Sequence, residues 1–389
     1  MNRNLRLVAV LLLAMALVAR SPVLAAAAFI LAGSTYATGW WTTRAERGLR
    51  VRQNVAETVG FGEQATVTIE VANRSLLPIP WVQVVDSVPL ALRLGLPQRH
   101  AFALGAGARR EFTYRVLGSR RGFYHIGPLR LLTGDVLGLH TRQLNAPRVE
   151  ITVLPRVLPL PRLGLPAQLV WGPLRANVRR SEDPARPAGV RPYQASDGIR
   201  RLDWKSTARQ GELLVRRAEP SVTPETTLAL AFGRHDFPPR ILQDCLERGA
   251  VAAASLGVAL LQRKLPVALV SNGQDPKNPA SDVVLPHGKG ESHRHLLLHL
   301  IGRLQTSDQR LLWDLLARQP LPWGGTVALV IADLDIEHIP HLAALRRRGQ
   351  HLVALLLEPT ASGLALAHGQ GISAWPVNRE GVPLAEQTG

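Results

Sequence analysis

Two apolar runs at the start of the chain constrain its fold more than any other feature. Leu7 to Ala19 is an unbroken apolar run of 13 residues, and Val23 to Trp41 is a second apolar stretch of 19 residues. A helix that spans the hydrocarbon core of a bilayer needs roughly 20 residues, with about 17 as the lower limit. The second stretch therefore predicts a spanning helix. The first spans only if Leu5 and its flanking residues join it while the arginines snorkel to the surface.

The arginines beside these runs indicate how the helices would cross a membrane. Arg20 alone stands in the turn between the runs, and the others stand outside them, at Arg3, Arg6, Arg44, Arg47, Arg50 and Arg52. The positive-inside rule then places both ends in the cytoplasm, and Trp40 and Trp41 suit the membrane interface. We predict that residues 1–48 form a transmembrane helical hairpin in the inner membrane of a bacterium, with the other domains in the cytoplasm. A single anchor and a signal peptide cleaved near Ala25 are the alternatives.

The charge of the chain lies in its first 219 residues. The net charge is +17 over 389 residues, and it divides into +6 for residues 1–52, +4 for 53–155, +7 for 156–219 and zero for 220–389. Such a charge suggests an anionic membrane surface or a nucleic acid as a partner. A chain of this length is expected to hold two or three domains. Its single cysteine, Cys245, excludes a disulfide within the chain.

Residues 49–155 alternate in the manner of β-strands. The clearest run is Ala65 to Val71, and further strands are expected at Trp81–Val85, Glu111–Val116 and Arg148–Leu154. Several short strands at this spacing predict a small β-sandwich-like domain. Such a domain would serve either as an interaction module or as a spacer that holds the next domain away from the bilayer.

Residues 156–219 begin as a proline-rich linker and continue into the densest polar segment of the chain. Five prolines between positions 155 and 173 exclude a regular helix or a central strand there. In the polar segment, Ser196-Asp197-Gly198 predicts a turn, and the spacing from Ile199 to Ala208 predicts a short helix. We expect the following residues to act together, in binding or in structure: Arg191, Tyr193, Asp197, Arg200, Arg201, Asp203, Trp204, Lys205 and Arg209.

Three interpretations of this polar segment compete. It can be a buried salt-bridge cluster that holds the linker onto the next domain, a docking surface for a partner protein, or a catalytic or nucleic-acid site. The aspartates would repel phosphate, and few aromatic residues are interspersed for base stacking. Nucleic acid is therefore an unlikely partner.

Residues 220–389 alternate between strand and helix patterns. The expected strands are Thr227–Phe232, Val267–Val270, Thr326–Ala332 and His351–Leu357, and the expected helices are Ile241–Arg263, His295–Leu304, Gln309–Leu316 and Ile339–Arg347. Apolar strands separated by helices predict an α/β domain with a parallel sheet covered on both faces. Residues 359–389 are rich in glycine and small residues and are expected to be partly disordered at their end.

The polar segment carries a family resemblance. Arg191-x-Tyr193, Asp197, the run from Arg200 to Lys205, and Ala208-Arg209 resemble the signature of the domain of unknown function 58 family. Upstream, Arg121-Gly122-Phe123-Tyr124-x-x-Gly127-Pro128 and Gly134-Asp135-x-x-Gly138-Leu139 are similar to that family's segment before the linker. Ser196-Asp197-Gly198 departs from the family, where a glycine precedes the aspartate. The resemblance extends over nearly the whole chain.

The resemblance implies a von Willebrand factor A-like fold for residues 220–389 and a MoxR-type AAA+ ATPase as partner. Domains of that fold often hold Mg²⁺ through an Asp-x-Ser-x-Ser motif after the first strand. Here the first strand leads into Phe232-Gly233-Arg234-His235-Asp236, which lacks the motif's aspartate and both serines. Asp333 and Asp335, after a later strand, are weak metal candidates. We therefore expect neither a bound metal nor another cofactor.

Other chemistry is sparse in the sequence. No Gly-x4-Gly-Lys-Ser/Thr loop occurs, so the chain is not itself a P-loop ATPase. His293, His295 and His299 lie close in sequence but are interpreted as partly exposed histidines rather than metal ligands. Cys245 is interpreted as a small core residue rather than a nucleophile.

These observations predict a non-catalytic scaffold or adaptor that presents its α/β domain to a MoxR-type AAA+ ATPase or to a client protein. Two alternatives from other classes stay open. One is a metal-dependent enzyme that uses Asp197, Asp203 and Asp333. The other is a membrane-tethered nucleic-acid binder that uses the basic segment 156–219.

Overall fold

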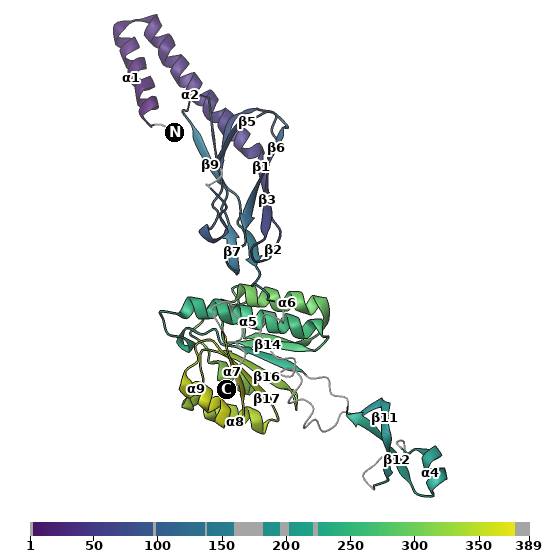
Figure 1. Cartoon of the computed structure of the whole chain (residues 1–389). Coiled ribbons are helices and arrows are strands. Elements are labelled where there is room, and N and C mark those ends of the chain that lie inside the picture. The colour runs from purple at the N-terminus through teal and green to yellow at the C-terminus, as the bar shows by residue number, and fades with distance from the viewer. Residues whose placement is uncertain are drawn as a thin grey trace. The chain divides into compact units, whose positions relative to one another are not determined.

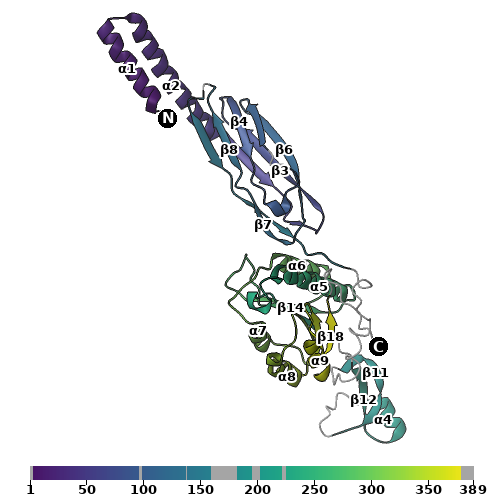
Figure 2. The ribbon, with the colours of Figure 1, turned by 60° about the vertical axis from the view of Figure 1, so that its left-hand side comes forward.

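The structure is a computed structural model that describes residues 3–95, 99–136, 138–158, 182–194, 202–220 and 225–377. The chain divides into two compact units, Met1–Pro155 and Arg156–Gly389. Helices and β-sheets that resemble a sandwich make up the first unit, and a mixed α/β sheet with a separate two-stranded arm makes up the second (Figures 1 and 2).

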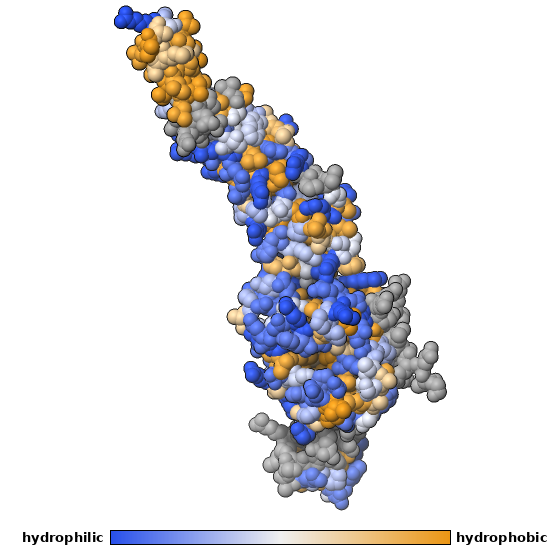
Figure 3. All heavy atoms as spheres, turned by 90° about the vertical axis from the view of Figure 1, so that its left-hand side faces the viewer, coloured by the Kyte–Doolittle hydropathy of each residue, from blue (hydrophilic) through white to orange (hydrophobic). Residues whose placement is uncertain are grey.

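The first unit begins with two helices that lie side by side, α1 (Arg3–Ala19) and α2 (Pro22–Gly48). Among the described residues, α2 alone is long and apolar enough to cross a membrane, and α1 is a shorter apolar helix. Figure 3 shows a largely apolar surface on these helices. The proline at the first position of α2 costs no hydrogen bond, because that N–H has no partner within the helix.

The last two turns of α2 pack on the β-sheets of the same unit. Thr42 and Ala45 are buried there, each about 3% exposed. The indole Nε1–H of Trp41 donates to the carbonyl oxygen of Pro78 at 3.0 Å. Trp41 is therefore tied to the β-sheets of the unit, whereas Trp40 is exposed.

Three sheets form the β-rich part of this unit, with strand orders β1-β3-β6, β5-β4-β8-β9 and β2-β10-β7. The strands are β1 (Leu49–Asn54), β2 (Thr58–Val59), β3 (Gln64–Asn73), β4 (Ile79–Val85), β5 (Arg99–Leu104), β6 (Arg109–Leu117), β7 (Gly122–Ile126), β8 (Arg130–Gly134), β9 (Thr141–Asn145) and β10 (Val149–Val153). The period-two pattern from Ala65 to Val71 places alternate side chains of β3 in the core. The β-sandwich-like prediction is therefore confirmed.

The second unit centres on a six-stranded sheet of order β15-β14-β13-β16-β17-β18. Its elements are β13 (Thr226–Leu230), α5 (Leu242–Gln262), β14 (Val267–Ser271), β15 (Val283–Gly288), α6 (Gly290–Arg303), α7 (Leu312–Arg318), β16 (Thr326–Ile331), α8 (Ile339–Arg347), β17 (His351–Leu356), α9 (Ala361–Gly369) and β18 (Ser373–Pro376). Helices α5 and α6 cover one face, and α7, α8 and α9 cover the other (Figures 1 and 2).

The prediction of a wholly parallel sheet is wrong at one edge. Strand β15 pairs antiparallel with β14, whereas the other neighbours in this sheet are parallel. Strand β15 is half-buried and contains Pro286, which an edge strand tolerates and a central strand does not. The elements α9 and β18 were also missed, although their segment is ordered. The end of that segment, residues 378–389, lies outside the described residues.

Part of the predicted linker forms a two-stranded arm. Strands β11 (Glu182–Pro192) and β12 (Leu214–Pro220) pair antiparallel, and helix α4 (Trp204–Gln210) lies between them in the chain. Leu202, Leu214 and Val215 are buried in this region. The proline-rich start of the linker, residues 159–181, lies outside the described residues.

Candidate functional site

The polar segment singled out in the sequence lies on the two-stranded arm. The backbone N–H of Tyr193 donates to Leu213 O at 2.8 Å, and that of Asp203 donates to Leu214 O at 2.8 Å. Leu202 also forms an isolated antiparallel bridge with Val215. These backbone bonds tie both ends of the segment to β12 and so bring Tyr193 and Asp203 to the same part of the arm.

Helix α4 starts later than the sequence predicted. Its N-cap is Asp203, whose Oδ1 accepts hydrogen bonds from the backbone N–H of Lys205 at 3.1 Å and of Ser206 at 3.3 Å. An aspartate in this position satisfies donors that the first helical turn leaves without a partner. The predicted start at Ile199 is therefore wrong, because Leu202 is extended and paired with β12.

Among the described residues of the polar segment, Asp203 has a structural role, and several others lie on the surface. Asp203 caps α4, whereas no residue of α4 is buried. Trp204 is 64% exposed, and Lys205 and Arg209 are exposed on the same helix. Neither cation makes an ion pair with any residue that the structure describes.

Asp197, Arg200 and Arg201 lie outside the described residues, and only the backbone of Arg191, paired with Val215, is described.

A second candidate region is the carboxyl edge of the six-stranded sheet, where open α/β sheets bind ligands. Here Asn272, which follows β14, connects two loops: its Oδ1 accepts from the backbone N–H of Phe232, and its Nδ2 donates to Asp236 Oδ2, both at 2.7 Å. The backbone N–H of Gly233 donates to the same carboxylate oxygen at 2.9 Å. Burial raises the pKa of Asp236 from its ordinary value.

This network occupies the loop after β13, which includes Phe232-Gly233-Arg234-His235-Asp236. One carboxylate oxygen of Asp236 accepts a hydrogen bond from Gly233 in its own loop. The neighbouring side chains face Asp308 Oδ1, with Arg234 Nε at 3.6 Å and His235 Nε2 at 3.9 Å. The sequence analysis did not single out Asn272. Its signal was an asparagine directly after an entirely buried strand.

The two weak metal candidates also have structural partners. Asp333 Oδ2 accepts from the backbone N–H of Thr360 at 3.0 Å and from its hydroxyl at 2.5 Å, while Oδ1 accepts from Leu334 N at 2.8 Å. Asp335 caps a 3-10 turn through Ile336 N at 2.6 Å. Within the described residues, no group of three or more His, Cys, Asp and Glu side chains is arranged to hold a metal ion.

The three clustered histidines do not share one environment. His293 is buried, with Nε2 2.7 Å from the carbonyl oxygen of Val267, so its interpretation as partly exposed is wrong. His295 is exposed, with Nε2 3.5 Å from the carboxylate of Glu291. His299 is partly buried. The hydrogen bond of His293 connects α6 to strand β14 and so accounts for its burial.

The single cysteine is a core residue, as predicted. Cys245 is fully buried on α5, and burial raises the pKa of its thiol to about 11. A thiol that stays protonated at neutral pH is a poor nucleophile. Beside it, the buried guanidinium of Arg248 donates to Leu357 O at 2.6 Å and pairs with Asp244 and Glu358. This arginine ties helix α5 to the end of β17.

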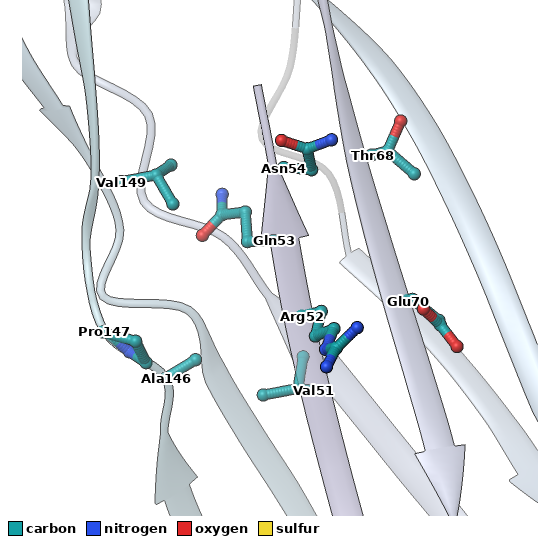
Figure 4. Close-up of a pocket in the computed structure, with 9 residues that line it drawn as sticks. All are labelled: Val51, Arg52, Gln53, Asn54, Thr68, Glu70, Ala146, Pro147 and Val149. Carbon is teal, nitrogen blue, oxygen red and sulfur yellow. The ribbon is translucent and has the colours of Figure 1, made fainter. Parts of the chain in front are cut away.

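The first unit contains an open cleft between β1, β3 and the chain just before β10 (Figure 4). Gln53 extends into it, and its Nε2 donates to Asp86 Oδ2 at 2.9 Å. Asp86 is buried, also accepts from the hydroxyl of Tyr114, and has a pKa raised by burial. Among the described residues that line the cleft, Glu70 alone has a carboxylate. It does not assemble paired acid–base groups.

The upstream motif with Asp135 has a clear structural role. Both oxygens of Asp135 accept backbone hydrogen bonds, from Leu139 N at 2.9 Å and from His140 N at 2.8 Å. Its Oδ2 also lies 3.1 Å from His140 Nδ1. His140 Nδ1 is 3.3 Å from the hydroxyl of Thr38 on α2. This loop therefore connects the β-sheets to the long apolar helix.

Comparison with known proteins supports the family resemblance. Residues 189–354 match the family described as "Protein of unknown function DUF58". A curated relative, the uncharacterized protein YeaD of Bacillus subtilis (strain 168), is 24% identical over 262 residues, which cover 61% of this chain and 58% of YeaD. The chain thus spans less than two thirds of that relative's length. The predicted resemblance is confirmed over the matched region, which includes β12, α4 and most of the α/β sheet.

Solved structures resemble only parts of the chain. A CARDB domain of the PF1109 protein from Pyrococcus furiosus, in complex with di-metal ions, is 17% identical, with a TM-score of 0.22; the match covers 27% of this chain and 87% of that one. A β-glucosidase from Listeria innocua is 15% identical, with a TM-score of 0.18, over 28% of this chain and 16% of the enzyme. At these scores neither likeness carries an argument about function.

Proposed function

Because residues 189–354 match the DUF58 family, we propose that the protein is a membrane-anchored, non-catalytic adaptor. Residues 1–48 would anchor it as a hairpin in the cytoplasmic membrane of a bacterium. Its arm and its α/β domain, which we propose to be von Willebrand factor A-like, would bind a MoxR-type AAA+ ATPase or a client protein in the cytoplasm.

One observation carries the docking part of this proposal. Trp204 is 64% exposed on a helix that buries none of its residues. Tryptophan and arginine are enriched among the residues that dominate binding energies at protein interfaces. Lys205 and Arg209 are exposed on the same short helix, so α4 offers both an aromatic anchor and two cations to a partner. A tryptophan that leaves most of its surface in solvent contributes little to folding, which supports a role in binding.

The environment of the aspartates favours an adaptor over a metal-dependent enzyme. Asp203 is engaged as the cap of α4, and Asp333 accepts three hydrogen bonds at the start of α9 and the end of β16. Carboxylates that already accept several protein donors have fewer free lone pairs for a hard cation. These contacts support structural roles for both side chains.

The membrane part of the proposal is supported by α2. This helix is 27 residues long, and the apolar part before Trp41 is exposed along most of its length. A core helix of a soluble protein would bury such a surface. The shorter α1 lies beside it, which supports a hairpin over a single span.

The test is a detergent pull-down of tagged full-length protein from cells of its source, with and without ATP, with captured proteins identified by mass spectrometry. We expect an AAA+ ATPase with the wild type, and its loss with Trp204→Ala. The matched control is Trp323→Ala, which removes another exposed tryptophan, 71% exposed, from the α/β sheet domain. Asp203→Asn keeps a cap and should keep the ATPase.

The outcomes separate the parts of the proposal. Loss of the ATPase with Trp204→Ala alone supports docking through α4. Retention by every variant keeps the adaptor but removes α4 as the docking surface. Absence of any AAA+ ATPase under all conditions contradicts the proposed partner.

A further inference from the structure

We propose that the junction between α2 and β9 is a binding site for the phosphate headgroup of an anionic phospholipid. A cleft of about 580 Å³ opens there. Its lining combines aromatic rings, hydroxyls and basic groups from both elements: Tyr36, Trp40, Thr43, His140, Thr141 and Arg142. The inference rests on the proposed function, because the cleft meets lipid only if α2 crosses the membrane.

The position of the cleft along α2 points to headgroups rather than to acyl chains. At about 1.5 Å per residue, the apolar part from Pro22 to Trp41 spans about 30 Å, the thickness of the hydrocarbon core. Its end therefore lies where the core gives way to the polar interface. Tyr36 and Trp40 are 79% and 56% exposed in that region, which is where such amphipathic rings concentrate.

The protein side of the cleft is rigid. Both carboxylate oxygens of Asp135 accept backbone hydrogen bonds from the loop before β9, and Oδ2 also holds His140 Nδ1 at 3.1 Å. The imidazole lies against the α2 backbone, where a Cβ on Gly39 would come within 3.2 Å of His140 Nε2. A glycine at this position lets helix and loop approach closely. Figure 1 shows β9 beside the second half of α2.

Charge at the cleft favours an anion. Arg142 is half exposed, and its Nε lies 3.6 Å from Glu46 Oε2, its acidic partner among the residues that the structure describes. Arg44 and Arg47 are exposed on the same turns of α2. Asp135 is buried and already hydrogen-bonded. Three arginines against one accessible carboxylate leave positive charge at the depth of the headgroups. Arg142 is held by this long ion pair and by a hydrogen bond of 3.5 Å from its Nη2 to Thr43 Oγ1, both at the surface, and such weak contacts allow the side chain to turn toward a phosphate.

The experiment uses full-length protein in a non-ionic detergent. Phosphatidylglycerol and phosphatidylcholine with the same acyl chains are titrated in separate arms, and native mass spectrometry measures the bound lipid. We expect phosphatidylglycerol to bind one to one and more tightly than phosphatidylcholine. Arg142→Gln should weaken phosphatidylglycerol binding about fivefold, the effect of one basic residue near an anionic surface.

Arg115→Gln is the control of equal charge change. Arg115 is exposed on β6 and pairs with Thr66 of β3. Thr66 is seven residues from Asn73, the residue of β3 that pairs with Leu49 directly after α2. Arg115→Gln should leave phosphatidylglycerol binding unchanged. Equal binding of the two lipids, or equal losses in the two variants, overturns the proposal. Full displacement of the lipid by inorganic phosphate also overturns it, because the site would then select free phosphate.

A separate measurement tests the anchor on which the site depends. Carbonate extraction of membranes should leave wild type and Arg142→Gln in the membrane pellet alike. A soluble wild type would refute the anchor, and with it the site's exposure to lipid. A pelleted wild type without headgroup preference would refute only the site.

Discussion

Helices α5 and α4 are stabilised in two different ways. Helix α5 buries fifteen of its 21 residues, including the charged Arg248, whereas α4 buries none of its seven. Burial of apolar surface stabilises the first helix. The second relies on its cap, Asp203, and on a glycine at its C-terminal end, Gly211, in the left-handed conformation. Helix α5 is therefore stabilised by packing in the sheet domain, whereas the side chains of α4 face solvent.

The largest expected effect comes from the buried charge of α5. Replacing Arg248 by alanine should lower the free energy of unfolding of the α/β sheet domain by about 3 kcal/mol. The change leaves a cavity under α5 and removes the donor to the carbonyl of Leu357. Hydrogen exchange of the β17 peptides in full-length protein would measure this loss.

A control separates the volume of Arg248 from its charge. Arg248→Met refills most of the space without the guanidinium, so it should recover part of the stability. Arg209→Ala on α4 should change exchange in the sheet domain by less than about 0.5 kcal/mol, because its side chain is exposed. Equal effects of Arg248→Ala and Arg209→Ala would refute the contrast between the two helices.

The next effect concerns the carboxyl edge of the sheet. A Cβ on Gly363 would lie 2.0 Å from Asp333 Oδ1, and that carboxylate is held by Thr360 and Leu334. Gly363→Ala should therefore destabilise α9 and β18 by about 1–3 kcal/mol through overpacking. Gly369→Ala, in open space on the same helix, should be neutral or slightly stabilising. The free energy of opening from hydrogen exchange of α9 gives both values, and a neutral Gly363→Ala would show that Asp333 is free to move.

The sequence predicted these regions unequally, for physical reasons. The pattern of α5 and the alternation of β3 are local, and the structure confirms both. The partner of Asp333 stands 27 residues away, and Asn272 connects loops from two strands, so neither contact leaves a periodic signal. Only the packed fold brings such residues together.

The same reason explains the misplaced start of α4. Spacing alone allowed a helix from Ile199, because Leu202 fits one face of it. Pairing with β12 keeps Leu202 extended, and Asp203 then supplies the cap. The edge strand β15 was missed because its short run is interrupted by Pro286 and is only half-buried.

A smaller effect is expected from the cap of α4. Asp203→Ala removes the acceptor for the N–H groups of Lys205 and Ser206 and should cost the helix about 1 kcal/mol. Asp203→Asn should cost less, since asparagine caps nearly as well. Hydrogen exchange of the α4 peptide would show faster exchange in the alanine variant. If both variants exchange like the wild type, Asp203 does not hold the helix.

The smallest effect is expected from Trp204, and it decides between structure and binding. Because the side chain is 64% exposed, Trp204→Ala should change the stability of the arm by less than about 0.5 kcal/mol. Hydrogen exchange of α4 and β12 in the full-length protein would measure this. If Trp204→Ala lowers the stability of α4 as much as Asp203→Ala does, the indole packs against the arm in solution. The absence of the ATPase from the Trp204→Ala pull-down would then result from a destabilised arm. Unchanged exchange together with a lost partner would place the defect at the interface itself, because the helix that presents Trp204 would still be intact.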